Sequence, residues 1–572
     1  MRRIFHFLRG YRVDALLGPI LKLCEATLEL IVPLIIANII DTGIALGDTG
    51  YIVKQCLWLL LLGAAGLAFS VTAQYFCARA AVGVVTGMRS SLFAHIGTLS
   101  YTEIDRLGTS SMITRMTSDA NQVQTGVNLT LRLLLRSPFV VFGAMIMASA
   151  IDPDMAGSFG LTILALSVVV FGIMLISMPL YKRVQRKLDG VVTRTRENLS
   201  GARVIRAFCK EKSEIDSFDT ESGALMRVQK LVGRISALMN PLTYIIINVA
   251  IVLLIHTGAI KVSSGALTAG QVVALYNYMS QILVELIKMA NFIITMTKAV
   301  ASAGRISSVL DISSSMKDGT VSEGAGSEYA LELEDAALTY LGASEPSLEG
   351  ITLKAKKGET IGIIGGTGSG KTSLINLIPR FYDVSSGSVK VDGVDVRDYS
   401  IEYLRSRIAL VPQKAVLFAG TVRDNMRLGN EGATDGEIIE ALKVAQALGV
   451  AEEKGGLDGY IEQGGRNLSG GQRQRLTIAR ALVKKPEILI LDDSASALDY
   501  ATDASLRQAI KNMDTGATVL IVSQRASSIM YADKIIVLDD GTPDGVGTHE
   551  ELLRSSAVYR EIYASQFEGG AV

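Results

Sequence analysis

Two neighbouring carboxylates that follow an apolar run are the first candidates for chemistry in this sequence. Asp492 and Asp493 come directly after residues 488–491 (Ile-Leu-Ile-Leu), a pattern typical of a buried strand. A carboxylate placed there can polarise a water molecule or help to hold a metal ion. Gln524, in the tripeptide Ser-Gln-Arg at 523–525, is a second polar candidate. Its amide can hydrogen-bond a phosphate but cannot carry a proton charge at neutral pH.

A phosphate-binding loop accompanies these residues. Residues 365–372 read Gly-Gly-Thr-Gly-Ser-Gly-Lys-Thr and fit G-x-x-x-x-G-K-[ST], between an apolar strand pattern and a helical pattern. The glycines let backbone N–H groups surround phosphates, and the helix N-terminus adds a favourable dipole. Lys371 would neutralise the outer phosphates and Thr372 would ligate Mg²⁺. We therefore expect ATP and Mg²⁺ as cofactors, with ATP contacted by Gly365, Gly366, Thr367, Gly368, Ser369, Gly370, Lys371, Thr372 and Ser373.

The composition divides the chain into an apolar part and a soluble part. The chain has 572 residues, of which 49% are hydrophobic, and its mean hydropathy is +0.35. The apolar residues concentrate before residue 300. The predicted fold is a membrane α-helical domain followed by an α/β P-loop domain, over 1–305 and 331–572, with a linker over 306–330. Because 56 basic residues balance 56 acidic ones, no nucleic-acid partner is expected.

Six membrane spans are predicted in the first domain. A spanning helix needs about 20 predominantly apolar residues. Four runs satisfy this clearly, and two weaker ones contain charged residues such as Lys22 and Arg132. The predicted spans cover approximately 15–40, 55–78, 126–151, 155–181, 235–260 and 262–290.

The connections between the spans predict the orientation of the chain. Basic residues gather before the first span and in the connections 79–125 and 182–234, whereas the opposite connections are short. We therefore expect a multi-pass protein of a bacterial plasma membrane, with both termini cytoplasmic. Helical periodicity in both long connections indicates helices that continue into the cytoplasm. Short helices at their tips, near 101–107 and 209–217, would transmit force to the second domain; simple cytoplasmic loops are the alternative.

Charged residues within the spans have two possible explanations. Glu25 and Glu29 share one helix face, and Glu285 and Lys288 lie three residues apart in the sixth span. Such groups are costly in a membrane and often contact a substrate or a cation. The other explanation is polar packing between helices or a position near the membrane interface.

The segment Leu-Ser-Gly-Gly-Gln at 468–472, together with the phosphate loop, resembles the ATP-binding cassette (ABC) transporters. The resemblance covers essentially the whole chain and indicates an exporter-type half-transporter, with six spans and one cassette. It implies that Tyr340 stacks on adenine, that Gln413 senses Mg²⁺, and that Asp492 holds Mg²⁺ through water. It also implies a dimer, because the segment contacts ATP on the partner cassette through Ser469, Gly470, Gly471 and Gln472. The Mg²⁺ ligands implied are Thr372, Gln413 and Asp492.

Two positions depart from the family pattern. The catalytic glutamate of the family is Asp493 here, and its switch histidine is Gln524. Both changes fall on hydrolysis positions, while the binding motifs are intact. This predicts a chain whose own site binds ATP but hydrolyses it weakly, and which completes the catalytic site of a partner. The partner expected is a second half-transporter with an intact glutamate and histidine; a homodimer with two weak sites is less favoured.

The function predicted from the sequence is ATP-driven export of a small amphiphilic molecule, lipid or peptide, by alternating access. The chain would be the degenerate-site subunit of a heterodimeric exporter, in contact with membrane lipids and the transported substrate. Two alternatives remain: an importer that uses the exporter fold, and a regulatory membrane protein gated by ATP. The sequence does not distinguish among substrates.

Overall fold

The computed structural model describes residues 6–494, 496–513 and 516–567. The chain divides into two compact units. The first, called the helical unit, contains residues 1–97 and 109–312. The second, called the α/β unit, contains residues 98–108 and 313–572. The short segment 98–108 therefore packs with the α/β unit, although it lies between two stretches of the helical unit in the sequence.

Six helical stretches in the described part of the helical unit are long and apolar enough to cross a membrane. The shortest has 37 residues and the longest has 53. At about 1.5 Å per residue all six are longer than the roughly 30 Å of bilayer hydrocarbon, so each extends beyond the membrane. The six stretches are Leu8–Ile44, Thr49–Gly97, Thr109–Ile151, Pro153–Ser200, Glu211–Ser263 and Ala269–Leu310.

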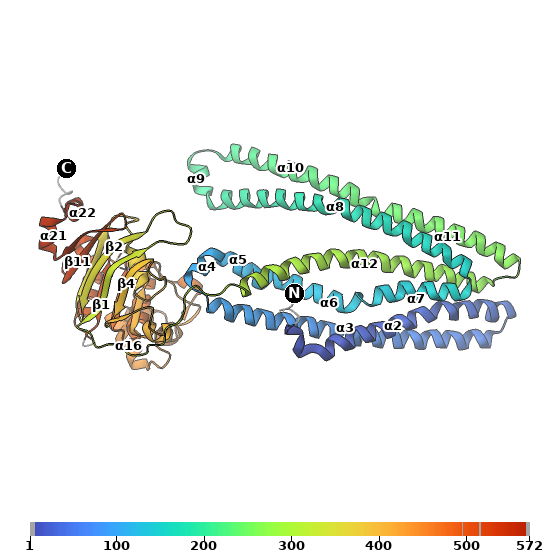
Figure 1. Cartoon of the computed structure of the whole chain (residues 1–572), viewed down its shortest axis with the longest axis horizontal. Coiled ribbons are helices and arrows are strands. Elements are labelled where there is room, and N and C mark those ends of the chain that lie inside the picture. Colours follow the sequence, from blue (N-terminus) through green and yellow to red (C-terminus); the bar gives the residue numbers. More distant parts are fainter. Residues whose placement is uncertain (1–5, 495, 514–515, 568–572) are drawn as a thin grey trace. The chain divides into compact units, whose positions relative to one another are not determined.

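Several of these stretches are built from more than one helix. In the fourth and fifth, α8 runs beside α10 and α11, and the short helix α9 joins α8 to α10 (Figure 1). The first three stretches contain η1 (Leu8–Tyr11), α2 (Arg12–Asn38), the π-helical turn η2 (Ile39–Ile44), α3 (Thr49–Gly97), α5 (Thr109–Thr114), the π-helical turn η3 (Arg115–Asp119), α6 (Ala120–Leu133) and α7 (Arg136–Ile151). The others contain α8 (Pro153–Ser200), α9 (Ala202–Ala207), α10 (Glu211–Ala237), α11 (Met239–Ser263) and α12 (Ala269–Leu310).

Two helix boundaries differ from the sequence expectation for local reasons. The last span begins at Ala269 rather than near 262, because Gly265 has φ +78° and Thr268 forms a capping box with Gln271. The short helix of the second connection lies at Ala202–Ala207, N-terminal to the expected range 209–217. Cys209 has a left-handed φ of 51°, and α10 starts two residues later.

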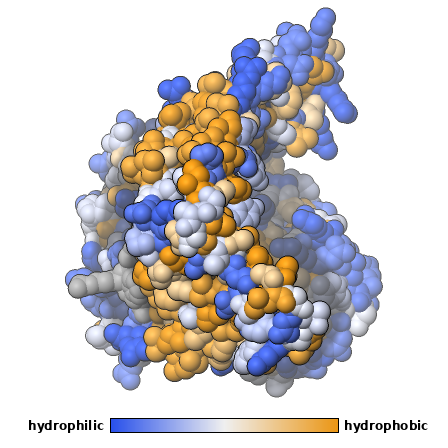
Figure 2. All heavy atoms as spheres, turned by 90° about the vertical axis from the view of Figure 1, so that its right-hand side faces the viewer, coloured by the Kyte–Doolittle hydropathy of each residue, from blue (hydrophilic) through white to orange (hydrophobic). Residues whose placement is uncertain are grey.

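The outer surface of the helical unit is extensively apolar. Large hydrophobic side chains such as Leu60, Leu67, Phe142, Leu161 and Val252 are exposed. Figure 2 looks onto the ends of the long helices and shows hydrophobic side chains over much of their surface. Exposed apolar surface of this extent is typical of a protein embedded in lipid.

The charged residues within the spans form ion pairs. Arg136 of α7 donates to Glu285 of α12 at 2.5 Å and to Glu29 of α2 at 2.7 Å. Lys288 also donates to Glu285, at 2.8 Å, and Lys22 pairs with Glu25 at 2.5 Å. Arg136 thus joins three helices, and the pairing favours the explanation of polar packing between helices.

The α/β unit contains a central six-stranded sheet in the order β12-β11-β3-β10-β9-β6. Its strands from β11 to β6 are parallel, and β12 (Thr542–Gly547) is antiparallel to β11 (Lys534–Asp539). A second, antiparallel sheet has the order β2-β1-β4-β5. The remaining strands are β1 (Tyr329–Leu338), β2 (Leu348–Lys356), β3 (Thr360–Gly365), β4 (Ser386–Val391), β5 (Val394–Asp395), β6 (Ile408–Val411), β9 (Ile488–Asp492), β10 (Thr518–Val522) and the short pair β7 (Gly420–Thr421) and β8 (Tyr460–Ile461).

The helices of the α/β unit cover these sheets and enclose two large apolar cores. One core lies between the two sheets and contains Leu333 and Ile363, both 0% exposed. The helices are α4 (Tyr101–Leu107), α13 (Lys371–Leu377), α14 (Ile401–Arg407), α15 (Val422–Arg427), α16 (Asp435–Val444), α17 (Leu448–Glu453), α18 (Gly470–Val483), α19 (Tyr500–Lys511), α20 (Ala526–Ile529), α21 (His549–Ser555) and α22 (Ala557–Phe567), with 3₁₀ turns η4 (Gly456–Asp458) and η5 (Gln463–Gly465).

Three neighbouring parallel strands position the candidate site. β3, β10 and β9 lie side by side, so their carboxyl ends meet at one edge of the sheet. Gly365, Val522 and Asp492 are the last residues of these strands. The phosphate loop, Gln524 and the two carboxylates therefore come together, although they are far apart in the sequence.

Candidate functional site

The phosphate loop turns sharply between β3 and α13, and its glycines are required there. Gly368 and Gly370 have φ values of +86° and +89°, which side chains of L-residues rarely adopt. A Cβ at Gly365 would lie 2.2 Å from the carbonyl oxygen of Leu538 on the neighbouring strand. Substitution at these positions would change the loop, so the glycine pattern follows from the backbone geometry.

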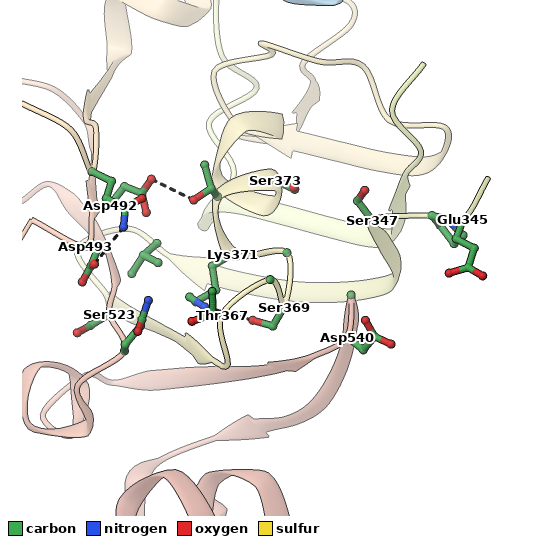
Figure 3. Close-up of a pocket in the computed structure, with 18 residues that line it drawn as sticks. Glu345, Ser347, Thr367, Ser369, Lys371, Ser373, Asp492, Asp493, Ser523 and Asp540 are labelled. Atoms are coloured by element: carbon green, nitrogen blue, oxygen red, sulfur yellow. Dashed lines mark hydrogen bonds between the residues drawn. The ribbon is translucent and has the colours of Figure 1, made fainter. Parts of the chain in front are cut away.

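A cavity of about 480 Å³ opens above this loop. Figure 3 shows Asp492 and Asp493 at one side of the loop residues and Glu345 and Asp540 at the other. The lining residues are Glu345, Pro346, Ser347, Thr367, Gly368, Ser369, Gly370, Lys371, Thr372, Ser373, Gln413, Asp492, Asp493, Val522, Ser523, Gln524, Asp540 and Gly541.

Lys371 places its ammonium group inside the loop. Its Nζ donates to the carbonyl oxygens of Gly365 and Gly366, at 2.9 and 2.5 Å. Burial lowers the pKa of Lys371, and the negative charges of Asp493 and Asp492 partly oppose that shift. A cation held by carbonyl dipoles in a partly buried loop is a suitable partner for a phosphate anion.

Oxygen atoms suited to a hard cation lie beside the lysine. The hydroxyl of Thr372 donates to Oδ2 of Asp492 at 3.2 Å. Asp492 is only 5% exposed, and burial raises its pKa although the Thr372 hydrogen bond opposes the shift. With the amide oxygen of Gln413, this donor set has the chemistry that Mg²⁺ prefers. Among the described residues, no group of three or more His, Cys, Asp or Glu side chains could hold a metal by itself.

Asp493 and Gln524 follow neighbouring strands and both line the cavity. Asp493 has a left-handed φ of 44°, and its N–H donates to the carbonyl oxygen of Val522 at 2.9 Å. Its carboxylate accepts a hydrogen bond from Nε2 of Gln413 at 3.3 Å. The backbone carbonyl of Gln524 accepts from Gln566 at 2.8 Å, while its side chain is exposed to the cavity. The two positions that differ from the family pattern thus belong to one wall.

Ser469 and Gly471 belong to a different part of the unit and do not line this cavity as described. Ser469 caps α18: its N–H donates to Oε1 of Gln472 at 2.9 Å, and its hydroxyl accepts from the N–H of Gln472. Gly470 begins α18, and a Cβ at Gly471 would lie 3.0 Å from the carbonyl oxygen of Ala497. The segment presents the N-terminus of a long helix outside the cavity of its own chain.

Tyr340 also lies outside the cavity lining but is attached to it. Its hydroxyl donates to Oγ of Ser373 at 3.0 Å, and its ring meets that of Tyr382 edge to face at 5.0 Å. Sequence reasoning missed several lining residues on the far side, including Ser347 and Asp540. The sequence indicated only a turn at the dipeptide Asp540-Gly541. This turn follows β11 and lies near the phosphate loop because β11 pairs with β3.

Comparison with known proteins agrees with this architecture. The family model for the transmembrane region of ABC transporters matches residues 15–286, and the model for the ABC transporter domain matches residues 348–496. An uncharacterised ABC transporter ATP-binding protein of Mycobacterium tuberculosis is 38% identical over 566 residues, covering 98% of this chain and 97% of the relative. The chain therefore belongs to the ABC transporters, as an exporter-type half-transporter with a membrane domain fused to an ATP-binding cassette.

Other relatives span nearly the whole chain. The ABC transporter ATP-binding protein YfiB of Bacillus subtilis is 35% identical over 572 residues, covering 99% of each chain. An ATP-dependent lipid A-core flippase of Desulfotalea psychrophila is 30% identical, also covering 99% of each chain. A solved bacterial Atm1-family ABC exporter with ATP bound has the same fold, with a TM-score of 0.81, 22% identity and 99% coverage of both chains.

These matches confirm the predicted fold class, which is a domain of six long apolar helices together with an α/β nucleotide-binding domain. The chain is an ABC-type ATPase and a multi-pass membrane protein. The α/β unit is the ATP-binding cassette of the chain.

Proposed function

We propose that this chain is the degenerate-site subunit of a heterodimeric ABC exporter. The observation that carries the proposal is the contrast within one cavity. The phosphate loop, Lys371 and Thr372 line it with residue types that suit ATP, whereas Asp493 and Gln524 line it where the family pattern has glutamate and histidine. A chain that binds ATP and hydrolyses it slowly needs a competent partner to complete a transport cycle.

ATP binding is assigned to the loop and its neighbours. The backbone N–H groups of residues 366–372 would surround the phosphates, with Lys371 moving from the carbonyl oxygens that it now contacts to the phosphate charge. Thr372, Gln413 and Asp492 would hold Mg²⁺, which neutralises charge on the phosphates when it is bound. Tyr340 would stack on adenine after its ring turns toward the cavity.

Weak hydrolysis is assigned to two side chains. The carboxylate of Asp493 is one methylene shorter than that of glutamate, and a misplacement of about 1 Å can cost about 100-fold in rate. Gln413 already donates to one oxygen of this carboxylate, at 3.3 Å, so that oxygen is shared between the amide and any water. Gln524 can hydrogen-bond the γ-phosphate but cannot take a proton charge at neutral pH.

The intact helix N-terminus at Ser469 is assigned to the partner's ATP. Helix N-termini bind phosphate through free N–H groups and the helix dipole, and Ser469 lies outside this chain's own cavity. The pair would then have one slow site, at this chain's phosphate loop, and one fast site. The fast site would combine the partner's glutamate and histidine with this chain's Ser469, Gly470, Gly471 and Gln472.

The transported molecule is proposed to be an amphiphile, lipid or peptide. The name of one relative, a lipid A-core flippase, supports a lipid-like substrate. The basic residues of the long connections support cytoplasmic termini in a bacterial plasma membrane. Export would then move the substrate away from the side that carries the cassettes.

Copurification from native membranes tests this proposal. An affinity-tagged chain should bring down a second half-transporter that has the catalytic glutamate and switch histidine, and the pair should accumulate a fluorescent lipid in inverted vesicles. Replacing the partner's glutamate with glutamine should abolish transport, while Asp493→Asn should leave more than about half of it. Copurification of a homodimer would reject the degenerate-site role. An equal loss of transport from the two substitutions would also reject it. Depletion of lipid from the vesicles would indicate import, and ATP binding without any transport would indicate a gated regulator.

A further inference from the structure

Two adjacent aromatic residues after α13 face the short helix α4. The ring of Phe381 lies 4.6 Å from that of Tyr101, measured between centroids. The hydroxyl of Tyr382 donates to Oδ2 of Asp105 at 2.5 Å. Because Tyr101 and Asp105 are four residues apart, they occupy one face of α4. The loop after α13 therefore contacts this face at two points, one apolar and one charged.

The loop that carries the two rings is held firmly. Arg380 has a left-handed φ of 51° and is 3% exposed. Its guanidinium donates to Asp383 at 2.7 Å and to the carbonyl of Arg397 at 3.2 Å. Arg405 donates to the carbonyl oxygens of Pro379 and Arg380, at 3.1 and 2.9 Å. A backbone conformation that is unfavourable for a non-glycine residue is thus fixed by buried hydrogen bonds, which fixes the direction of both rings.

The α4 helix is also held by a buried carboxylate in its first turn. Glu103 forms a capping box with Ser100. Its Oε1 also accepts from the N–H of Ser315, at 3.2 Å, in the segment that leads into β1. The helix is therefore attached to the cassette through Tyr101, Glu103 and Asp105, while its chain neighbours are α3, which ends at Gly97, and α5, which begins at Thr109. A displacement of α4 must be transmitted to these two helices through the chain.

Tyr382 is also connected to the nucleotide cavity, through Tyr340 and Ser373. Its ring meets Tyr340 edge to face at 5.0 Å, and the hydroxyl of Tyr340 donates to Ser373, which lines the cavity. Only the ring of Tyr382 lies between Asp105 and Tyr340 along this series of contacts. Burial raises the pKa of Tyr382, and the charge of Asp105 raises it further. The phenol therefore stays protonated and remains a hydrogen-bond donor.

We propose that Tyr382 is a positioning residue that links Tyr340, at the nucleotide cavity, to Asp105 of α4. The inference rests on the proposed function, in which adenine stacks on Tyr340. When Tyr340 turns to meet the base, the edge-to-face contact with Tyr382 changes, and the hydrogen bond to Asp105 transfers that change to α4. The same contacts act in the opposite direction, because coupling between two sites is reciprocal.

Hydrogen exchange of the full-length chain in lipid nanodiscs tests this link. In the unsubstituted chain, ATP with Mg²⁺ should slow amide exchange over residues 101–107. Tyr382→Phe keeps the ring but removes the hydroxyl, and it should reduce that slowing to less than half. Because coupling is reciprocal, the Kd of the Tyr382→Phe variant for ATP should rise by about fivefold, which is the low end of typical coupling. Asp105→Asn should give a similar change, and the double variant should give no further change, since both act through one bond.

Tyr403→Phe is the matched control, because the ring of Tyr403 packs on Tyr399 and beneath Arg407 in the same cassette. This variant should keep both the slowing and the ATP affinity of the unsubstituted chain. Unchanged slowing in Tyr382→Phe, or additive effects of the two substitutions, would overturn the link alone. Failure of the unsubstituted chain to bind ATP would overturn the link together with the proposed function.

Discussion

Nε2 of Gln413 donates a hydrogen bond to Oδ2 of Asp493 at 3.3 Å, across the wall of the nucleotide cavity. Gln413 follows β6 and Asp493 follows β9, which are neighbouring parallel strands. The carboxylate that would have to orient water is therefore engaged with the amide proposed to sense Mg²⁺. Because aspartate is short, a carboxylate held in this way does not reach as far toward the phosphates as glutamate would. This relationship underlies the slow hydrolysis proposed for the chain's own site.

Ser469→Ala should stop ATP hydrolysis by the pair while this chain still binds ATP. The serine is proposed to contact the γ-phosphate on the partner, and removing one such donor typically costs roughly 100-fold in rate. The measurement is the ATPase rate of the purified pair, together with ATP binding to the isolated chain.

Loss of a helix cap must be separated from loss of a phosphate contact, because Ser469 caps α18. Thr434→Ala is the matched control, since Thr434 forms the same type of capping box with Glu437 at the start of α16. Both substitutions should cost about 1 kcal/mol of stability, but only Ser469→Ala should lower the rate. Equal rates for the two variants would reject the assignment of Ser469 to the partner's site.

Arg136→Met should strongly destabilise the helical unit. The side chain of Arg136 is 7% exposed, and it pairs with the side chain of Glu285, which is 4% exposed. Removing one partner of a buried ion pair costs about 3–5 kcal/mol, whereas replacing both with apolar residues is often neutral. Thermal unfolding in nanodiscs should therefore show a large loss for Arg136→Met and recovery for Arg136→Met with Glu285→Met.

Lys288→Ala provides the comparison for this prediction. Lys288 also pairs with Glu285, but its side chain is 43% exposed, and exposed pairs contribute about 0–1 kcal/mol. Its substitution should shift the melting temperature only slightly. If Arg136→Met were no more harmful than Lys288→Ala, the ion cluster would not be what joins α2, α7 and α12.

The stability contribution of Glu103 should depend on pH. Burial tends to raise the pKa of Glu103, but hydrogen bonds from Ser100 and Ser315 outweigh it, and the folded pKa lies below the ordinary 4.5. A lowered folded pKa stabilises the fold above the unfolded value, and that contribution is lost as the pH falls through the folded pKa. Glu103→Gln should therefore lower the melting temperature at pH 7 and have a smaller effect near pH 4.

An exposed glutamate separates this effect from general acid sensitivity. Glu349 is exposed in the same cassette, so Glu349→Gln should change the melting temperature only slightly at both pH values. If Glu103→Gln lowered the melting temperature by the same amount at pH 7 and at pH 4, the role assigned to the carboxylate would be contradicted. Melting curves of the three proteins at both pH values provide the measurement.

The features that the sequence predicted correctly are local in the chain. The apolar runs and the loop at 365–372 are continuous segments, and their residue types determine what can form there. The pairs that organise the molecule are distant in sequence: Arg136 with Glu285, and Tyr382 with Asp105. No spacing rule relates such residues, because their approach depends on the packing of several helices or strands.

Local backbone geometry explains the smaller differences. The start of α12 depends on the capping box of Thr268 with Gln271, a signal that is present in the sequence but was outweighed by the apolar residues before it. The tip of the second connection depends on a left-handed conformation at Cys209, a residue type that gives no indication of a turn. The far wall of the nucleotide cavity, at Asp540, required the strand order of the sheet.

The rate of ATP hydrolysis by the purified full-length chain without its partner, with two copies in each nanodisc so that the Ser469 segment of one copy can complete the site of the other, tests the central claim most directly. Three forms should be compared at saturating ATP and Mg²⁺: the unsubstituted chain, Asp493→Glu, and Asp493→Glu combined with Gln524→His. The account predicts ATP binding with negligible turnover for the first form, little recovery for the second because Gln524 remains, and an increase of about 100-fold for the third. Rapid turnover by the unsubstituted chain would contradict the account.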